Sequence, residues 1–229
     1  MIKNLPFVFS NFAMTADGKI AFANHSFVPF GSKHDRERMM ELRAAADAII
    51  CGAGTIKETN AVLGTGGKKF ERLRLKNGLA KELLRIIVSG EGSISPKAKI
   101  FRSGSSPVIV LATARIPKKR LNRLRAVAEV KIFGRQKINL FAALCWLRQK
   151  RNVKRLLCEG GGELHGALIR ANLVAELHLT ICPKIFGGKN APTIADENGF
   201  LRLNEATQLR LKSIRRIGDE LFLVFAVRK

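Results

Sequence analysis

Short apolar runs separated by charged stretches constrain the fold of this chain most strongly. Residues 83–89 and 107–112 leave no room for polar alternation, so both faces of each expected strand must be covered. Further strands are expected at residues 5–14, 48–51, 153–158 and 174–182. Between them, helical spacing predicts helices at residues 33–46, 115–128, 139–150 and 163–171, with Ser32 as the N-cap of the first. The pattern predicts a three-layer α/β domain with a mixed, mainly parallel central sheet.

The end of the chain departs from this alternation. Residues 209–216 and 221–227 read as two strands joined at Gly218 and Asp219, which predicts a C-terminal antiparallel hairpin. Residues 64–69 contain Gly66 and Gly67 and are expected to form a loop. We find no linker or repeat, so residues 1–229 are expected to form a single domain. The longest apolar runs fall short of a membrane span, and the N-terminus does not read as an export signal.

Two junctions combine a buried strand, glycines and the start of a helix. One is Glu159-Gly-Gly-Gly-Glu163, and the other is Gly52-Ala-Gly-Thr55. Glycines there let the backbone approach a ligand, and a helix N-terminus favours phosphate. Two such junctions in one domain suggest a ligand with several phosphates, such as a dinucleotide. Lys57 stands where a third glycine would complete GxGxxG, which disfavours a standard Rossmann domain.

The reactive residue types indicate neither a metal site nor disulfides. Cys51, Cys145, Cys158 and Cys182 are too widely spaced for a zinc pattern, and the four histidines show no metal-ligand pairing. We therefore expect free thiols in a reducing compartment, the cytoplasm, and no bound metal.

The net charge of +23 attracts polyanions. Anionic metabolites and nucleic acid are both candidate partners. The basic residues are dispersed, the chain has no Tyr and one Trp, and it lacks an aromatic-basic RNA-binding motif. Nucleic-acid binding is therefore expected to be adventitious.

Several blocks, in the same order, resemble the C-terminal reductase domain of the bifunctional riboflavin protein RibD. They lie at residues 13–21, 42–49, 52–55, 159–162, 177–180, 183–188 and 218–219. The resemblance implies a dihydrofolate-reductase-like fold, NADPH as cofactor, and a homodimer. It also implies reduction of the ribosyl group of a phosphoribosylamino-pyrimidine to ribityl, by hydride transfer to C1′. The substrate would be 5-amino-6-(5-phosphoribosylamino)uracil or its 2,5-diamino precursor.

The resemblance also assigns site residues. Lys19 and Glu159 are expected to be catalytic, and Glu159 with Asp17, Arg43 and Leu63 to bind substrate. The positions expected to hold NADPH are Ala21, Gly52, Gly54, Thr55, Ser89, Gly160, Gly161, Gly162, Glu163, Leu164, His165, Gly166 and Ala167.

Three positions depart from the family pattern on the substrate side. Phe27 stands where a serine is expected, Thr59 begins the place of an Asp-x-Pro piece, and Gly66 replaces an arginine. Lys68 or Lys69 could supply the lost phosphate contact. Two alternatives therefore stay open: a paralogous NADPH reductase with a pterin-like or other imine substrate, and a basic nucleic-acid-associated protein on this scaffold.

Overall fold

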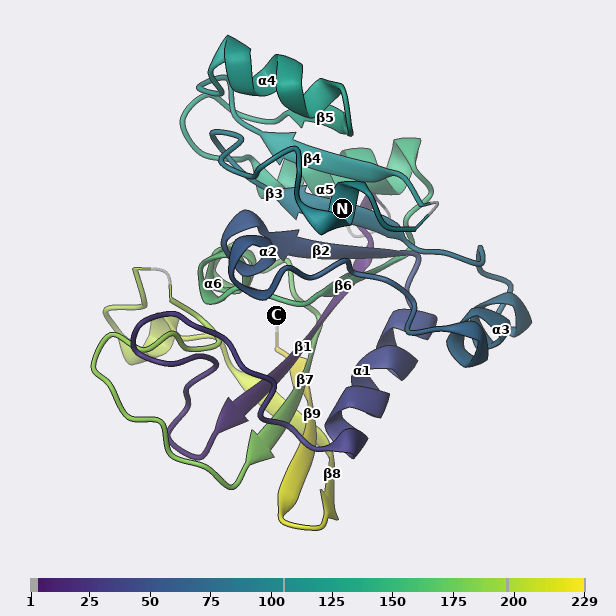
Figure 1. The fold of residues 1–229 in the computed structure, drawn as a ribbon. Coiled ribbons are helices and arrows are strands. Elements are labelled where there is room, and N and C mark those ends of the chain that lie inside the picture. Colours follow the sequence, from purple (N-terminus) through teal and green to yellow (C-terminus); the bar gives the residue numbers. More distant parts are fainter. Residues whose placement is uncertain (1–3, 105, 197, 229) are drawn as a thin grey trace. The chain divides into compact units, whose positions relative to one another are not determined.

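The computed structural model describes residues 4–104, 106–196 and 198–228 (Figure 1). Its internal contacts divide the chain into two compact units. Unit 1 comprises Met1–Phe7 and Met40–Leu157, and unit 2 comprises Val8–Met39 and Cys158–Lys229. Helix α1 (Lys33–Ala44) begins in unit 2 and ends in unit 1, and each unit is described here by itself.

Unit 1 contains the parallel strands that the apolar runs predict. Its strand order is β5-β4-β3-β2-β6, and β2 pairs with β3, β3 with β4, and β4 with β5, all in parallel. The strands are β2 (Ala48–Gly52), β3 (Leu84–Val88), β4 (Val108–Ala112), β5 (Glu129–Ile132) and β6 (Arg155–Cys158). Every residue of β4 is buried, as a strand covered on both faces requires.

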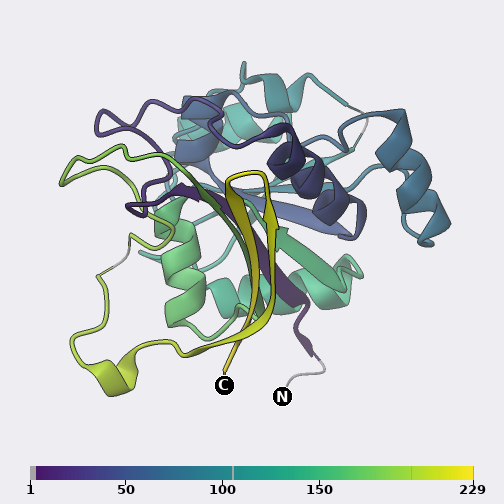
Figure 2. The same cartoon turned by 90° about the horizontal axis from the view of Figure 1, so that it is seen from below.

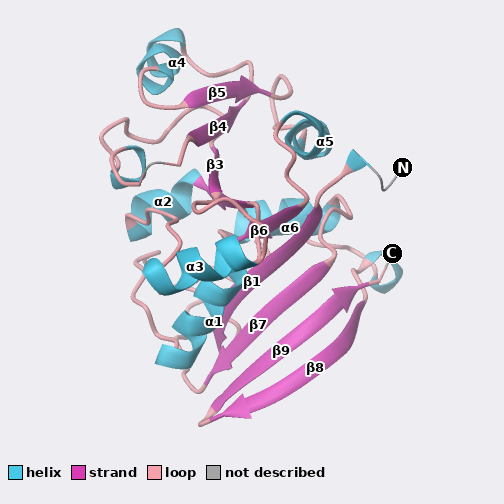
Figure 3. Ribbon diagram, turned by 90° about the vertical axis from the view of Figure 1, so that its right-hand side faces the viewer, coloured by secondary structure: helices cyan, strands magenta, loops and turns pink. Residues whose placement is uncertain are grey.

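The helices of unit 1 lie on both faces of its strands. They are α2 (Ala53–Thr59), α3 (Lys68–Lys76), α4 (Lys118–Arg125) and α5 (Leu140–Lys150), with a short 3₁₀ turn η2 (Lys99–Phe101). Figure 3 shows α2 and α4 on one side of β3, β4 and β5, and α5 on the other. Right-handed crossovers produce this arrangement, because the chain moves outward from β2 to β5 and then returns to β6.

Unit 2 carries the antiparallel end of the fold. Its strand order is β1-β7-β9-β8, with β1 parallel to β7 and the remaining pairs antiparallel. The elements are β1 (Phe7–Thr15), α6 (Gly162–Arg170), β7 (Glu176–Cys182), η3 (Leu203–Glu205), β8 (Leu209–Ile217) and β9 (Glu220–Val227). Figure 2 shows β8 and β9 as one long hairpin, which confirms the C-terminal prediction. An irregularity between Leu211 and Ser213 interrupts its register.

The apolar core of unit 2 lies on one face of β1 and β7. Phe12, Leu177 and Leu179 are buried there, with Leu223 and Phe225 of β9 packed against them. The α/β class, the parallel strands and the hairpin are thus as the sequence predicts.

Three local predictions were wrong. β5 was missed. Only one of its four residues, Val130, is buried, so the strand has no continuous apolar run in the sequence. Helix α3 begins at Lys68, inside the expected loop, and α4 is shorter than the expected 115–128. All four cysteines are free, and within the described part of the chain no helix is long and apolar enough to cross a membrane.

Candidate functional site

Lys19 is held in a tight turn that follows β1. The Thr15 amide donates to the Lys19 carbonyl at 2.9 Å, and the Lys19 amide donates to the Thr15 hydroxyl, also at 2.9 Å. Gly18 lies between them with φ +81°, a conformation that favours glycine. The Lys19 side chain is half-buried, and its Nζ lies 3.5 Å from the Ala191 carbonyl oxygen. The hydrogen bonds of the turn thus fix the main chain of Lys19, from which the side chain with its ammonium group extends.

Asp17, in the same turn, holds the loop that follows β7. Its carboxylate accepts from the Thr15 hydroxyl at 2.5 Å and from the amides of Phe186 and Gly187 at 3.2 and 2.7 Å. The Thr15 hydrogen bond, followed by the two amides, lowers the pKa of Asp17. These contacts organise the site, while substrate binding by Asp17 stays a prediction.

The glycine turn follows β6 directly. Glu159 is half-buried and comes immediately after the strand, Gly160 has φ +103°, and the peptide between Gly160 and Gly161 is cis. Gly161 is the N-cap of α6 and has no side chain to cap the first-turn amides. An uncapped helix start of this kind suits a phosphate oxygen as acceptor.

The chain itself packs closely against Gly162. A Cβ on Gly162 would lie 2.3 Å from Asp196 Oδ2 and 2.4 Å from the Thr193 carbonyl oxygen. The chain itself occupies this space, so at Gly162 close packing explains the glycine. The Asp196 carboxylate also places negative charge beside the start of α6, which offsets part of the helix dipole there.

His165 lies one turn into α6 and is almost fully buried. Its Nδ1 lies 2.6 Å from the Ile194 carbonyl oxygen and so carries the proton, and its ring packs against Phe12 with centroids 4.6 Å apart. Burial lowers the pKa of His165, so the ring is neutral near pH 7. Nε2 is buried and has no hydrogen-bond partner within the described residues. Of the other expected cofactor positions in unit 2, Ala21, Leu164 and Gly166 are buried, Ala167 is half-buried and Glu163 is exposed.

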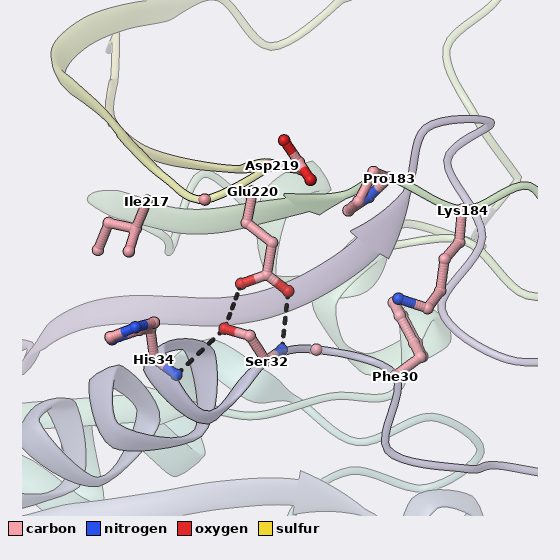
Figure 4. Close-up of a pocket in the computed structure, with 10 residues that line it drawn as sticks. Phe30, Ser32, His34, Pro183, Lys184, Ile217, Asp219 and Glu220 are labelled. Atoms are coloured by element: carbon pink, nitrogen blue, oxygen red, sulfur yellow. Dashed lines mark hydrogen bonds between the residues drawn. The ribbon is translucent and has the colours of Figure 1, made fainter.

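A cluster of carboxylates near the start of α1 was missed by the sequence analysis. Glu220 accepts from the Ser32 amide at 2.7 Å and from the Ser32 hydroxyl at 2.5 Å, beside a pocket of about 370 Å³ (Figure 4). The Ser32 hydroxyl in turn accepts from the amides of His34 and Asp35, which confirms Ser32 as the N-cap. Nothing in the hairpin sequence distinguishes Glu220 from a solvent-exposed turn residue.

Asp35 is a second carboxyl group of this cluster. Burial raises the pKa of Asp35, the Thr180 hydroxyl lowers it, and the charges of Glu220 and Glu159 raise it further. Cys182 Sγ lies 3.5 Å from Glu220 Oε1, and burial raises the pKa of its thiol to about 12. The negative charges of Glu220 and of the expected catalytic Glu159 therefore both act on Asp35.

The expected cofactor residues of unit 1 surround the ends of β2 and β3. Gly52 is the N-cap of α2 without a side-chain cap, and space is open around Gly54. The Thr55 carbonyl accepts from the Thr59 hydroxyl at 2.7 Å. The buried Ser89 hydroxyl accepts from the Ser93 amide at 3.0 Å.

Arg43 and Leu63, expected near the substrate, are both buried. Arg43 donates to the Gly64 carbonyl at 2.7 Å, which rules out an exposed residue on the helix surface. Gly66 has φ +89°, and a Cβ there would lie 2.3 Å from Met40 Sδ. An arginine therefore does not fit at Gly66, whereas Phe27 is simply exposed.

No group of three or more His, Cys, Asp or Glu in the described residues could hold a metal ion. The features that remain are glycine turns at strand ends, a lysine turn and neighbouring carboxylates, on an α/β fold with a C-terminal hairpin. The fold on which they lie is of the dihydrofolate-reductase-like class. Dihydrofolate reductase from Enterococcus faecalis shares this fold with a TM-score of 0.51 at 10% identity, covering 97% of each chain.

The chain belongs to the RibD C-terminal domain family, whose model matches residues 6–223. It is 33% identical over 215 residues to an Archaeoglobus fulgidus protein named 2,5-diamino-6-ribosylamino-4(3H)-pyrimidinone 5′-phosphate reductase, covering 93% of this chain and 94% of that protein. A Methanothermobacter thermautotrophicus protein with the same name is 30% identical, covering 97% and 99%.

Among solved structures, a pyrimidine reductase-like protein from Corynebacterium diphtheriae has the same fold. Its TM-score is 0.82 at 23% identity, covering 98% of this chain and 92% of that one. The chain is therefore an oxidoreductase domain of the riboflavin-pathway family, as the resemblance implied.

Proposed function

We propose that this chain is an NADPH-dependent reductase of 2,5-diamino-6-ribosylamino-4(3H)-pyrimidinone 5′-phosphate, acting in the cytoplasm. The assignment of this substrate is supported by the match of nearly the whole chain to two relatives with that name. Reduction of the ribosyl group would then precede removal of the amino group. The free cysteines agree with a reducing compartment.

The residues of unit 2 suit the parts of this reaction that the protein must supply. Bound NADPH supplies the hydride. The uncapped amides at the start of α6 suit one of its phosphate groups, and the buried neutral His165 leaves an acceptor nitrogen inside the unit. The Lys19 ammonium can stabilise developing charge on a ribose oxygen or donate a proton. Glu159 can accept hydrogen bonds from the pyrimidine amino groups.

Unit 1 contributes the remaining residues of the proposal. The uncapped Gly52 and the open space at Gly54 suit close approach of a phosphate. Thr55 and Ser89 are the other residues of unit 1 that we expect to bind NADPH. The buried guanidinium of Arg43 suits the substrate phosphate. Asp17 and Leu63 complete the predicted substrate contacts.

The direct test is to mix purified protein with NADPH and each pyrimidine phosphate, and to follow the loss of the reduced nicotinamide absorbance. We expect oxidation with the 2,5-diamino compound and little with its deaminated product. Lys19→Met should lower kcat by about 100-fold, whereas Lys189→Met, an exposed lysine of the same unit, should leave kcat unchanged. Tight NADPH binding without turnover of either compound would instead favour a paralogous reductase. Salt-sensitive oligonucleotide binding without NADPH affinity would favour the nucleic-acid alternative.

We propose in addition that the protein is a homodimer that pairs through the outer hairpin. Leu209, Leu211 and Ile214 of β8 share one face and are 39%, 48% and 58% exposed. In an edge-to-edge pairing of two β8 strands, the arginines of this strand would oppose one another, which is unfavourable. The apolar face carries far less charge and can pack against its copy across a two-fold axis.

Sedimentation equilibrium tests this pairing. Ile214→Glu should convert a dimer to a monomer, because it buries an unpaired charge. Ser213→Glu adds the same charge on the opposite face of the strand and should leave the dimer intact. A monomeric parent protein, or a dimer in both variants, would contradict the proposed interface.

A further inference from the structure

A six-residue segment connects the lysine turn with the start of α6. This strap comprises residues 191–196, Ala-Pro-Thr-Ile-Ala-Asp, in the connection between β7 and β8. Neither the sequence patterns nor the family resemblance drew attention to it. Its contacts with the two expected active-site turns are all within unit 2.

At its first end the strap contacts the lysine turn. The Ile20 amide donates to the Pro192 carbonyl at 2.9 Å, and Lys19 Nζ lies 3.5 Å from the Ala191 carbonyl oxygen. The first contact fixes the backbone beside Lys19, and the second orients its side chain toward the strap.

At its other end the strap packs on α6. The Asp196 amide donates to the Gly162 carbonyl at 3.1 Å, and the Ile194 carbonyl accepts from His165 Nδ1 at 2.6 Å. Thr193 and Asp196 fill the space that a side chain at Gly162 would need. The short distance directs the Nδ1 proton of His165 at the strap.

The strap is also braced internally. The Asp196 carboxylate accepts from the Thr193 amide at 2.9 Å and from the Thr193 hydroxyl at 2.6 Å. The Thr193 hydroxyl in turn accepts from the Ala195 amide at 3.3 Å. Such a side-chain-closed turn holds its carbonyl groups in fixed directions. The Ile194 carbonyl inside this turn receives His165, and the Pro192 and Ala191 carbonyls directly before the turn receive Ile20 and Lys19.

We propose that the strap is a positioning element for the reductase, which sets Lys19 and the glycine turn of α6 in register with each other. This inference rests on the proposed function for its catalytic meaning, and on the hydrogen bonds described above for its geometry. Thr193, Asp196 and His165 are then positioning residues that act through Lys19 and α6. A displacement of about 1 Å in such a group can cost up to about 100-fold in rate.

Variants at Asp196 separate the geometry of the strap from its charge. Asp196→Asn keeps an oxygen that accepts from Thr193 and removes the negative charge beside α6, so kcat should stay near the parent value and the KM for NADPH should stay or fall. Asp196→Ala removes the brace, so the KM for NADPH should rise and kcat should fall, together by about tenfold or more in kcat/KM. Asp219→Asn, at an exposed acid of the same unit, is the matched control.

A second pair of variants shows whether the strap acts through Lys19. Thr193→Ala should lower kcat in the parent protein but much less in the Lys19→Met background, while Thr193→Ser should restore it. A general loss of stability would lower activity by the same factor in both backgrounds. Equal factors, or parent-like kinetics in both Asp196→Ala and Thr193→Ala, would overturn the proposal.

Amide hydrogen exchange gives a readout that does not depend on activity. Asp196→Ala should speed exchange at Ile20, more than 170 residues away along the chain, and near His165, while strands β3 and β4 keep their protection. Unchanged exchange at Ile20 would reject the strap even if the reductase assay succeeds. A parent protein that fails to oxidise NADPH but shows the exchange pattern would reject the proposed function and keep the strap.

Discussion

Units 1 and 2 differ in the ionisable side chains that they bury. In unit 1, buried arginines donate to main-chain carbonyls: Arg74 to those of Arg43, Ala46 and Ala80, and Arg85 to those of Ile100 in η2 and Ser103 after it. In unit 2, the carboxylate of Glu220 and the rings of His165 and His178 are buried instead, and all four histidines of the chain belong to this unit. Arginine stays charged at any working pH, whereas histidine does not. Sensitivity to pH near neutrality should therefore reside in unit 2.

The difference also bears on the charge of the chain. Arg43, Arg74 and Arg85 are buried and tie loops together, so these positive charges do not contribute to an exposed basic surface. Part of the net charge of +23 therefore has a structural role. The charge is then weaker support for a nucleic-acid-binding function.

The largest expected effect comes from removing the arginine support of unit 1. Arg74→Met should lower the free energy of unfolding by about 3 kcal/mol or more, because it leaves several buried carbonyls without donors. Chemical denaturation followed by circular dichroism measures the change. Arg72→Met, on the exposed side of α3, should cost little, and a similar loss in both variants would mean that the buried hydrogen bonds are not the cause.

A smaller effect is expected from the carboxylate support of unit 2. Glu220→Gln weakens the charge-assisted hydrogen bonds to Ser32, which should cost about 1–2 kcal/mol. It also removes a negative charge that faces Asp35, so the pKa of Asp35 should fall. Thermal melts give the first quantity, and titration of the Asp35 carboxyl by NMR gives the second. An unchanged Asp35 titration would show that the two groups are not coupled.

Mildly acidic pH should destabilise unit 2 before unit 1. Burial lowers the pKa of His165, and burial followed by the charge of Arg38 lowers that of His178. The unfolded chain then binds more protons than the folded one, so these residues contribute stability above the ordinary value of about 6.5, and that stability is lost as pH falls below it. Hydrogen exchange should show β7 and β9 losing protection between neutral and mildly acidic pH, before β3 and β4. Equal loss in both sets of strands would remove the contrast.

The smallest effect is expected at the surface. Arg216 and Asp219 form an exposed ion pair with an N–O distance of 3.3 Å in the turn between β8 and β9. Asp219→Asn should change stability by less than about 0.5 kcal/mol, because exposed pairs gain little in water. Added salt should abolish even that difference. A larger effect would mean that this turn contributes more to unit 2 than its exposure suggests.

The sequence was most informative where one residue type reports one local requirement. Continuous apolar runs located β2, β3, β4 and β6, and Gly218 located the hairpin turn. It was less informative where a helix starts immediately after a flexible pair, as at Lys68, and where a strand buries a single side chain, as at Val130. In both cases tertiary packing decides the structure, and the local signal is weak.

The site shows the same limit. Lys19, Glu159 and the glycines could be proposed from short motifs, because the motif residues lie together in the chain. Glu220 meets Ser32 across 188 residues, and Ala191 meets Lys19 across 172, so no local pattern shows these contacts. The packing of Asp196 and Thr193 against Gly162 is likewise a contact that no local pattern shows.

The state of the thiols has a practical consequence for experiments on this protein. Burial raises the pKa of the Cys158 and Cys182 thiols to about 12, so almost none of either is thiolate at neutral pH, and Cys51 is buried as well. Cys145 on α5 is half-buried and should be the thiol that alkylating reagents reach first. A fluorophore attached there would report on unit 1 and leave the chemistry of unit 2 untouched.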